Sequence, residues 1–203
     1  MRHVRTLAAL VIVSLSPLCR GADAPKPAPF ENEIQAFEQS DSASPPPKDA
    51  VLFVGSSSIR MWTTLADDFP GVPVLNRGFG GSKIAHSTKY ADRIVIPCNP
   101  KTIVFYAGDN DIAGGRSPEQ VLADYKAFVE KIRAALPDTR ILFISIKPSI
   151  ARWKLVDQIR EANRLVKAFS ESSDKLGFID IFPQMLGSDG KPRADFSART
   201  GCT

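Results

Sequence analysis

Residues 50–60 read AVLFVGSSSIR, an apolar run that passes through a glycine and three serines into the start of a helical pattern. The run Ala50–Val54 is continuously apolar instead of alternating with polar residues, which is typical of a strand covered on both faces. We expect further strands of the same kind at Val72–Asn76, Thr102–Ala107, Arg140–Ile146 and Gly177–Phe182.

Helical patterns separate these runs. Ser117 followed by Pro118 indicates a helix start, with serine as the cap and proline at the first helical position, and Pro137 ends that helix. A second helix is expected from about Ile150 to Ser172, with an apolar stripe along one side. This alternation predicts an α/β domain in which a parallel sheet is flanked by helices on both faces.

Composition narrows the class of protein further. The 203 residues suit one domain, and the content of 43% hydrophobic and 24% charged residues allows a packed core. The net charge is only +4, which does not indicate the strongly basic surface of a nucleic-acid-binding protein. No apolar run approaches the roughly 18–20 residues of a membrane span. Two histidines and three cysteines exclude structural zinc sites built on paired cysteines.

The N-terminal residues 1–24 have the layout of a secretory signal peptide. Arg2 and Arg5 precede an apolar run from Leu7 to Leu18, and Ala22 and Ala24 are small residues at the −3 and −1 positions of a possible cleavage site. This layout predicts a secreted or periplasmic protein. Residues 25–48 are expected to be a leader with a short amphipathic piece around Phe30 to Phe37, and the folded domain is expected over residues 49–203.

Polar loops follow the first three expected strands. Residues 55–60 read GSSSIR, residues 76–82 read NRGFGGS and residues 108–111 read GDND. In open parallel sheets, ligands bind beyond the carboxyl ends of the strands, where the strand order reverses. We therefore expect a hydroxyl, a bare backbone amide and a side-chain amide to meet on one rim of the sheet.

These three groups suit acyl transfer. A serine at a helix N-terminus has its own N–H and the helix dipole directed at a developing oxyanion. A glycine lets a second backbone N–H approach without a Cβ in the way. An asparagine amide adds a third donor, and such donors are typically worth ~2.7–4 kcal/mol each in the transition state.

The three loops, in this order and spacing, resemble the sequence blocks of the SGNH hydrolases, also called GDSL-type esterases. The resemblance covers roughly Asp49 to Arg193. It implies a flavodoxin-like three-layer fold with five parallel strands and a metal-free site that needs no cofactor. Carried over block by block, Ser57 would be the nucleophile, Gly81 the oxyanion amide and Asn110 the oxyanion side chain. Ser56 departs from the pattern, since the commonest family motif has aspartate there.

The family's last block, Asp-x-x-His, supplies the general base, and this chain has no such pair. No histidine follows His86, so we expect impaired catalysis, because a serine hydroxyl without a base is a poor nucleophile. His86 itself is interpreted as a surface or satisfied histidine, with a substitute base as the alternative.

The tail from Asp195 allows a specific hypothesis. Read from the last base of the Asp195 codon, the possible codons allow Asp, Gly, Leu and His in succession after four other residues. We therefore hypothesise that one nucleotide has been lost near Asp195. The final helix of the family would then be missing. The last strand would lie at an edge with part of an apolar face uncovered, and solubility would be lower than with the restored frame.

Other motifs are weaker. Gly78–Gly81 lacks the glycine spacing of a dinucleotide site, and Asp109–Asp111 lacks the later oxygen ligands of a calcium loop. Cys98 is expected to be free, with a Cys98–Cys202 disulfide as the alternative. The charged stretch Asp157–Arg164 is expected to form a solvated helix face.

The sequence thus predicts an esterase that acts on a small acyl ester of a small molecule or carbohydrate through a Ser57 acyl-enzyme. The alternative is a non-catalytic, truncated or frameshifted form of the same fold that retains only ligand binding. A third possibility is a flavodoxin-like binding module. No nucleic-acid partner and no membrane span are expected, and the sequence does not indicate the oligomeric state.

Overall fold

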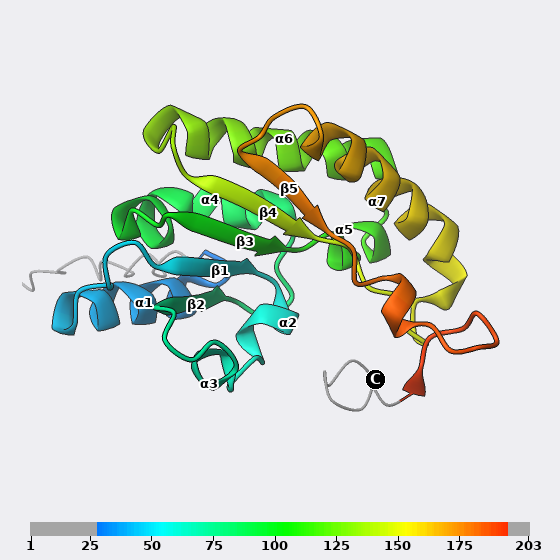
Figure 1. The fold of residues 1–203 in the computed structure, drawn as a ribbon, viewed down its shortest axis with the longest axis horizontal. Coiled ribbons are helices and arrows are strands. Elements are labelled where there is room, and N and C mark those ends of the chain that lie inside the picture. Colours follow the sequence, from blue (N-terminus) through cyan, green and yellow to red (C-terminus); the bar gives the residue numbers. More distant parts are fainter. Residues whose placement is uncertain (1–27, 195–203) are drawn as a thin grey trace, which may run out of the picture.

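The computed structural model describes residues 28–194 and contains one five-stranded, all-parallel sheet (Figure 1). Its strands are β1 (Val51–Gly55), β2 (Val74–Gly78), β3 (Thr102–Tyr106), β4 (Arg140–Ile144) and β5 (Leu176–Ile179). They lie in the order β2-β1-β3-β4-β5, which is the flavodoxin-like order. The expected fold class is confirmed. Strand bounds differ from the prediction mainly at β2, which begins two residues later, and at β5, which ends at Ile179.

The register of the sheet aligns the ends of three strands. Gly55, the last residue of β1, pairs with Gly78 of β2 on one side and with Tyr106 of β3 on the other. From β1 the chain runs to β2 on one side, and after β2 it crosses to β3 on the other side of β1, so the strand order reverses between β1 and β3. The three polar loops therefore start level with one another at this switch point.

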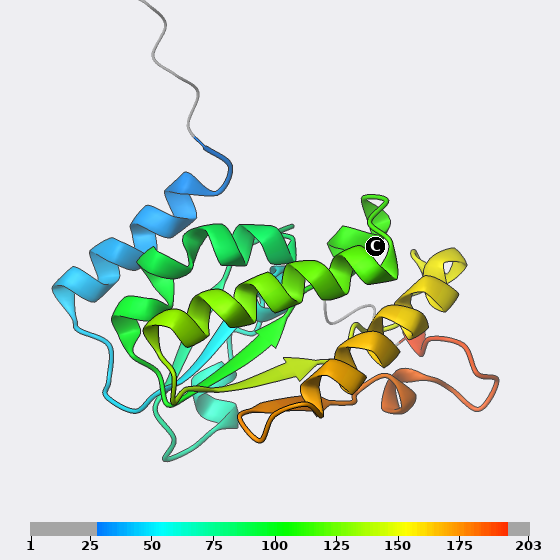
Figure 2. The same ribbon diagram turned by 90° about the horizontal axis from the view of Figure 1, so that it is seen from above.

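Three long helices cover one face of the sheet (Figure 2). They are α4 (Ile84–Ile94), α6 (Pro118–Ala135) and α7 (Val156–Ser170). The predicted start of α6 is confirmed, because the Ser117 hydroxyl accepts a hydrogen bond from the Gln120 N–H and the Gln120 side chain accepts one from the Ser117 N–H. The helix predicted from Ile150 begins only at Val156, after the short 3₁₀ turn η2 (Trp153–Leu155).

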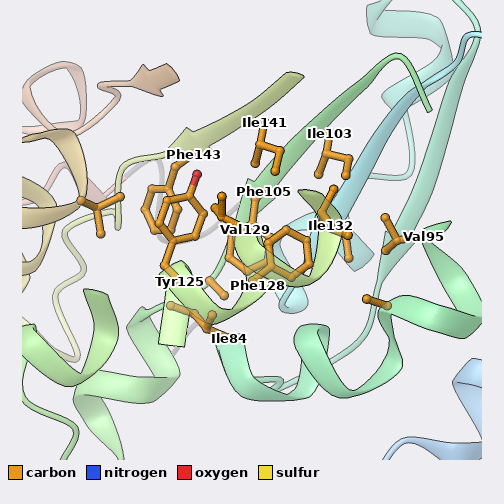
Figure 3. Close-up of a cluster of buried hydrophobic side chains, with 14 of the residues drawn as sticks. Ile84, Val95, Ile103, Phe105, Tyr125, Phe128, Val129, Ile132, Ile141 and Phe143 are labelled. Carbon is orange, nitrogen blue, oxygen red and sulfur yellow. The ribbon is translucent and has the colours of Figure 1, made fainter. Parts of the chain in front are cut away.

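The main core lies between these helices and the sheet (Figure 3). Alternate strand residues such as Ile103, Phe105 and Phe143 point into it and are fully buried. Phe105 packs at 4.5 Å between ring centroids against Phe128 of α6, and Tyr125 packs at 4.8 Å against Phe143. The sheet and α6 are thus joined by interleaved aromatic rings.

The opposite face is covered only by short elements in the described part of the chain. α2 (Ser57–Arg60) and α3 (Leu65–Asp68) pack there with Phe53, Val104 and Tyr106. Beside them lies an apolar hollow of about 520 Å³, bordered by β1, β3, β4 and β5. The prediction that the last strand lies at an edge is confirmed, and Ile179 of β5 is 39% exposed. Residues beyond Ala194, including Asp195 and Cys202, lie outside the described part.

Residues 31–43, inside the segment expected to be a leader, form the helix α1 (Glu31–Ala43), which packs on α4. Its Ile34 is fully buried in the main core. Arg93 of α4 forms ion pairs with Glu31 and Glu38. The packed part of the chain therefore begins well before Asp49, since this amphipathic piece is held by contacts to a helix that follows much later in the sequence. The expected signal peptide, residues 1–24, lies outside the described residues.

Candidate active site

Ser57 is the first residue of α2, directly beyond the end of β1. The helix can lie this close to the sheet because residue 78 is glycine: a Cβ there would come within 2.2 Å of the Arg60 nitrogen. The Ser56 N–H donates to the Tyr106 carbonyl at 2.9 Å and holds the turn against β3. Ser57 is partly exposed, and its hydroxyl has no hydrogen-bond partner among residues 28–194.

The neighbouring serine has a different environment. Lys147, which follows β4, donates from Nζ to Ser58 Oγ at 3.0 Å. This lysine is only 6% exposed. The Ser58 hydroxyl is therefore engaged, whereas that of Ser57 is available.

Gly81 lies in the loop after β2 with φ +72°, a backbone conformation that glycine adopts at little cost. A Cβ at this position would meet nothing within 4 Å, so backbone conformation and not space favours glycine here. The next residue ties the loop to β1, because Ser82 Oγ donates to the Gly55 carbonyl at 3.2 Å.

Asn110 lies in α5 (Asp109–Ala113), directly after β3. Its Nδ2 donates to the Ser82 carbonyl at 3.1 Å. Arg152 donates to Asn110 Oδ1 and to Asp109 Oδ2, each at 2.8 Å. Hydrogen bonds thus connect the loop after β3 to the loop after β2, and that loop to β1.

Asp111, the third polar residue of this loop, has a structural contact. Its carboxylate is fully buried and accepts a hydrogen bond from the Ile84 N–H, the first amide of α4, at 3.2 Å. Burial raises the pKa of Asp111 to about 6, while the bond from Ile84 acts in the opposite direction. With Asp109 paired to Arg152 and Asp111 bonded to α4, these carboxylates are occupied by protein groups.

His86 is held at the start of α4 and does not stand free. Its Nδ1 accepts a hydrogen bond from the Lys83 N–H at 3.0 Å, and its ring lies 5.0 Å from that of Phe30. Burial lowers the pKa of His86, and the nearby charges of Lys83 and Lys89 lower it further. This is the environment of a satisfied histidine that caps its own helix.

A hollow of about 930 Å³ opens beside α2. Ser58, Met61 and Trp62 line one side of it, and Asp180, Ile181 and Gln184 line the other. The hollow is large enough for a small ligand.

Lys147 and Arg152 also lie beside these loops, although no local sequence pattern indicates it. Both lie in the segment that follows β4, at the same edge of the sheet as the other loops. Ligands in open parallel sheets bind beyond the strand ends, and this fourth loop follows such an end, so its position after β4 is the sequence signal that points to it.

Three further findings concern the cysteine, metal ions and membranes. Cys98 is a buried free thiol among the described residues, and burial raises its pKa. Within residues 28–194, no group of three or more His, Cys, Asp or Glu side chains is arranged to hold a metal ion. The helices of this part of the chain are also too short or too polar to cross a membrane.

Comparison with known sequences gives a family match. The sequence model of the GDSL-like lipase/acylhydrolase family matches residues 52–200. A curated relative, platelet-activating factor acetylhydrolase IB subunit alpha1 from Bos taurus, is 28% identical over 151 residues. The match covers 69% of this chain and 62% of the bovine protein, so the chain spans less than two thirds of that relative's length.

Solved structures share the fold. A GDSL-like lipase from Bacteroides thetaiotaomicron superposes with a TM-score of 0.65 at 18% identity, over 82% of this chain and 92% of that one. An acetyl-xylooligosaccharide esterase from Geobacillus stearmophilus superposes with a TM-score of 0.52 at 15% identity, over 77% of this chain and 95% of that one.

Proposed function

Because the chain belongs to the GDSL-like lipase/acylhydrolase family, and is by this resemblance an ester hydrolase, we propose that it cleaves a small acyl ester through a covalent Ser57 intermediate. The observation that carries the proposal is the chain of hydrogen bonds from Asn110 to Ser82 and from Ser82 to Gly55. These hydrogen bonds link the loops that hold Asn110, Gly81 and Ser57 at one end of the sheet.

In the proposed reaction, Ser57 Oγ attacks the ester carbonyl and gives up its proton to a base. The backbone N–H of Gly81 and the free N–H of Asn110 Nδ2 donate to the oxyanion. The proton passes to the departing alcohol as the carbonyl re-forms, which leaves an ester between the acyl group and Ser57. Water then repeats the sequence and releases the acid.

The proposed reaction needs a base that accepts the proton of Ser57. The 203 residues contain only His3 and His86, and the Nδ1 of His86 is engaged by the Lys83 N–H. In serine hydrolases that lose a triad member, the remaining groups still give about 10³–10⁴-fold over water. We therefore propose slow turnover for a polypeptide of these 203 residues.

The names of the relatives support the substrate class. They describe an acetylhydrolase of platelet-activating factor and an esterase of acetylated xylooligosaccharides. An acetyl or similarly small acyl group on a small molecule or a carbohydrate is the substrate that we propose. The N-terminal sequence layout supports secretion or a periplasmic location.

A fluorophosphonate probe tests the nucleophile, with mass spectrometry to locate the adduct. We expect slow labelling at Ser57, its loss in Ser57→Ala and its retention in Ser58→Ala, together with slow hydrolysis of p-nitrophenyl acetate. Ser58→Ala is a matched control because it removes the adjacent hydroxyl of the same helical turn. An adduct on another residue, or labelling that survives Ser57→Ala, would contradict the proposal.

A second candidate is a non-catalytic form that retains ester or carbohydrate binding. The hydrogen bond from the Lys83 N–H to His86 Nδ1 favours this non-catalytic form, because no other histidine lies within residues 28–194 to act as a base. Absence of any labelling, combined with binding of acetylated oligosaccharides in calorimetry, would favour this candidate over the esterase.

A further inference from the structure

Arg152 makes a two-pronged contact with the start of α5. Its Nη1 donates to Asp109 Oδ2 and its Nη2 donates to Asn110 Oδ1, both at 2.8 Å. The arginine lies in the segment between β4 and α7, 42 positions beyond Asn110 in the sequence. Its side chain is 30% exposed, whereas that of Asp109 is 7% exposed.

This contact decides which way the Asn110 amide faces. A guanidinium has only donors, so the atom facing Arg152 must be the amide oxygen. The Nδ2 group then lies on the other side, where one N–H donates to the Ser82 carbonyl. An amide nitrogen carries two N–H donors, which leaves one for an oxyanion. A rotated amide would present its oxygen there instead and would repel the negative charge.

The same arginine also neutralises a neighbouring charge. Asp109 Oδ1 is buried without a hydrogen-bond partner among the described residues, so the carboxylate depends on Arg152 for its compensation. Left unpaired beside Asn110, this negative charge would oppose the developing oxyanion. A charged donor on Asn110 Oδ1 also polarises the amide and strengthens its remaining N–H as a donor.

We propose that Arg152 is a positioning residue that holds the Asn110 amide with its N–H toward the oxyanion and offsets the charge of Asp109. The loop after β4 thereby becomes a fourth part of the site. The inference rests on the proposed function for its catalytic consequence, whereas the hold on the Asn110 amide does not depend on catalysis.

The first test is spectroscopic and needs no turnover. In ¹⁵N-labelled protein, the side-chain amide signals of Asn110 are assigned by their loss in Asn110→Ala. Arg152→Gln should shift these signals or broaden them through rotation of the amide. Arg164→Gln is the matched control, since Arg164 pairs with Glu161 on the exposed side of α7 and should leave them unchanged. Unchanged Asn110 signals in Arg152→Gln would overturn the proposal.

The second test follows the rate of Ser57 labelling by the fluorophosphonate. We expect Arg152→Gln to slow it by about 10- to 100-fold, since loss of one oxyanion donor costs roughly 10²–10³. Arg152→Lys should remain slow, because one ammonium cannot span both acceptors. In an Asn110→Ala background, Arg152→Gln should slow labelling much less than it does in the wild type, because the amide that it orients is gone and only the unpaired charge of Asp109 still acts.

The outcomes separate the two proposals. Wild-type protein without a Ser57 adduct would contradict the proposed function, while the amide signals would still test the hold on Asn110. Normal labelling of Ser57 in Arg152→Gln, or an equal loss in the Asn110→Ala background, would overturn the role of Arg152. Thermal unfolding of each variant checks that the fold persists, and Arg152→Lys serves where Arg152→Gln fails to fold.

Discussion

At the scale of single residues, the polar groups near the site have unequal surroundings. Ser57 has a free hydroxyl, Ser58 is bonded to Lys147, and Asp111 is fully buried against the N-terminus of α4. Residues adjacent in the sequence thus have different chemical roles, because each faces a different element of the fold.

The buried carboxyl of Asp111 should make stability depend on pH. Its pKa rises from an ordinary 3.8 to about 6 on folding. The folded state therefore binds the proton more tightly than the unfolded state does, and protonation of Asp111 stabilises the fold. This contribution is complete below pH 4 and is lost as the pH rises through about 6, and a difference of this size corresponds to about 3 kcal/mol.

Asp111→Asn should therefore raise the free energy of unfolding at pH 7 by about 1–3 kcal/mol, because an amide oxygen can still accept from the Ile84 N–H. Urea unfolding at pH 4, 5.5 and 7 measures this difference. His86 has the opposite effect, because its lowered pKa makes stability fall as the pH drops below 6.5. This effect is present in both the wild type and the variant, so it cancels in the difference between them. Asp67→Asn, at an exposed carboxylate that forms no ion pair among the described residues, is the control, and a gain that does not depend on pH would contradict the prediction.

At the scale of elements, the contact between α2 and β2 controls where Ser57 lies. Gly78 provides the close approach, since a Cβ there would come within 2.2 Å of the Arg60 nitrogen, a backbone atom that cannot move alone. The four-residue helix must then move as a unit, and Ser57 moves with it.

Gly78→Ala should lower the free energy of unfolding by roughly 1–3 kcal/mol, as overpacking in a core does. It should also slow Ser57 labelling. Gly80→Ala is the matched control for stability, because its Cβ would meet only the flexible end of the Arg60 side chain, at 2.8 Å. Denaturant unfolding measures the stability of both variants. Equal free energies of unfolding for Gly78→Ala and Gly80→Ala would contradict the prediction, because α2 would then move without a loss of stability.

Elements were predicted well where local pattern and packing agree. The cap formed by Ser117 and Gln120 starts α6 as the sequence indicated. The helix expected from about Ile150 starts later, at Val156, because residues 149–152 turn instead, with the Arg152 N–H bonded to Ser149, and place Arg152 against α5. α1 was recognised only as an amphipathic piece, because its partner α4 begins 53 positions after the first residue of α1.

At the scale of the whole molecule, the two faces of the sheet are covered unequally within residues 28–194. Three long helices pack on one face, whereas an apolar hollow of about 520 Å³ opens on the other, between the strands and the side chains of Trp62 and Phe69. Exposed apolar surface of this kind binds hydrophobic dyes and favours association.

The hollow should bind the dye ANS, and Ile179→Lys should reduce the dye fluorescence at least about twofold, because a charge at its edge disfavours apolar ligands. Ile150→Lys is the matched control: Ile150 is 55% exposed but does not border the hollow. Fluorescence titration measures binding, and sedimentation measures association. Equal dye binding by wild type and Ile179→Lys would contradict this view of the exposed face.

Local sequence was enough to predict the strand runs, the parallel α/β class and the three polar loops, because each depends on a local apolar pattern or on residues adjacent in the chain. The strand order, the docking of α1, the burial of Asp111 and the contacts of Lys147 and Arg152 emerge only when the elements pack together. Lys147 meets Ser58 across 89 positions and Arg152 meets Asp109 across 43. The partner of a long charged side chain is set by how the elements pack, and no short stretch of sequence contains that information.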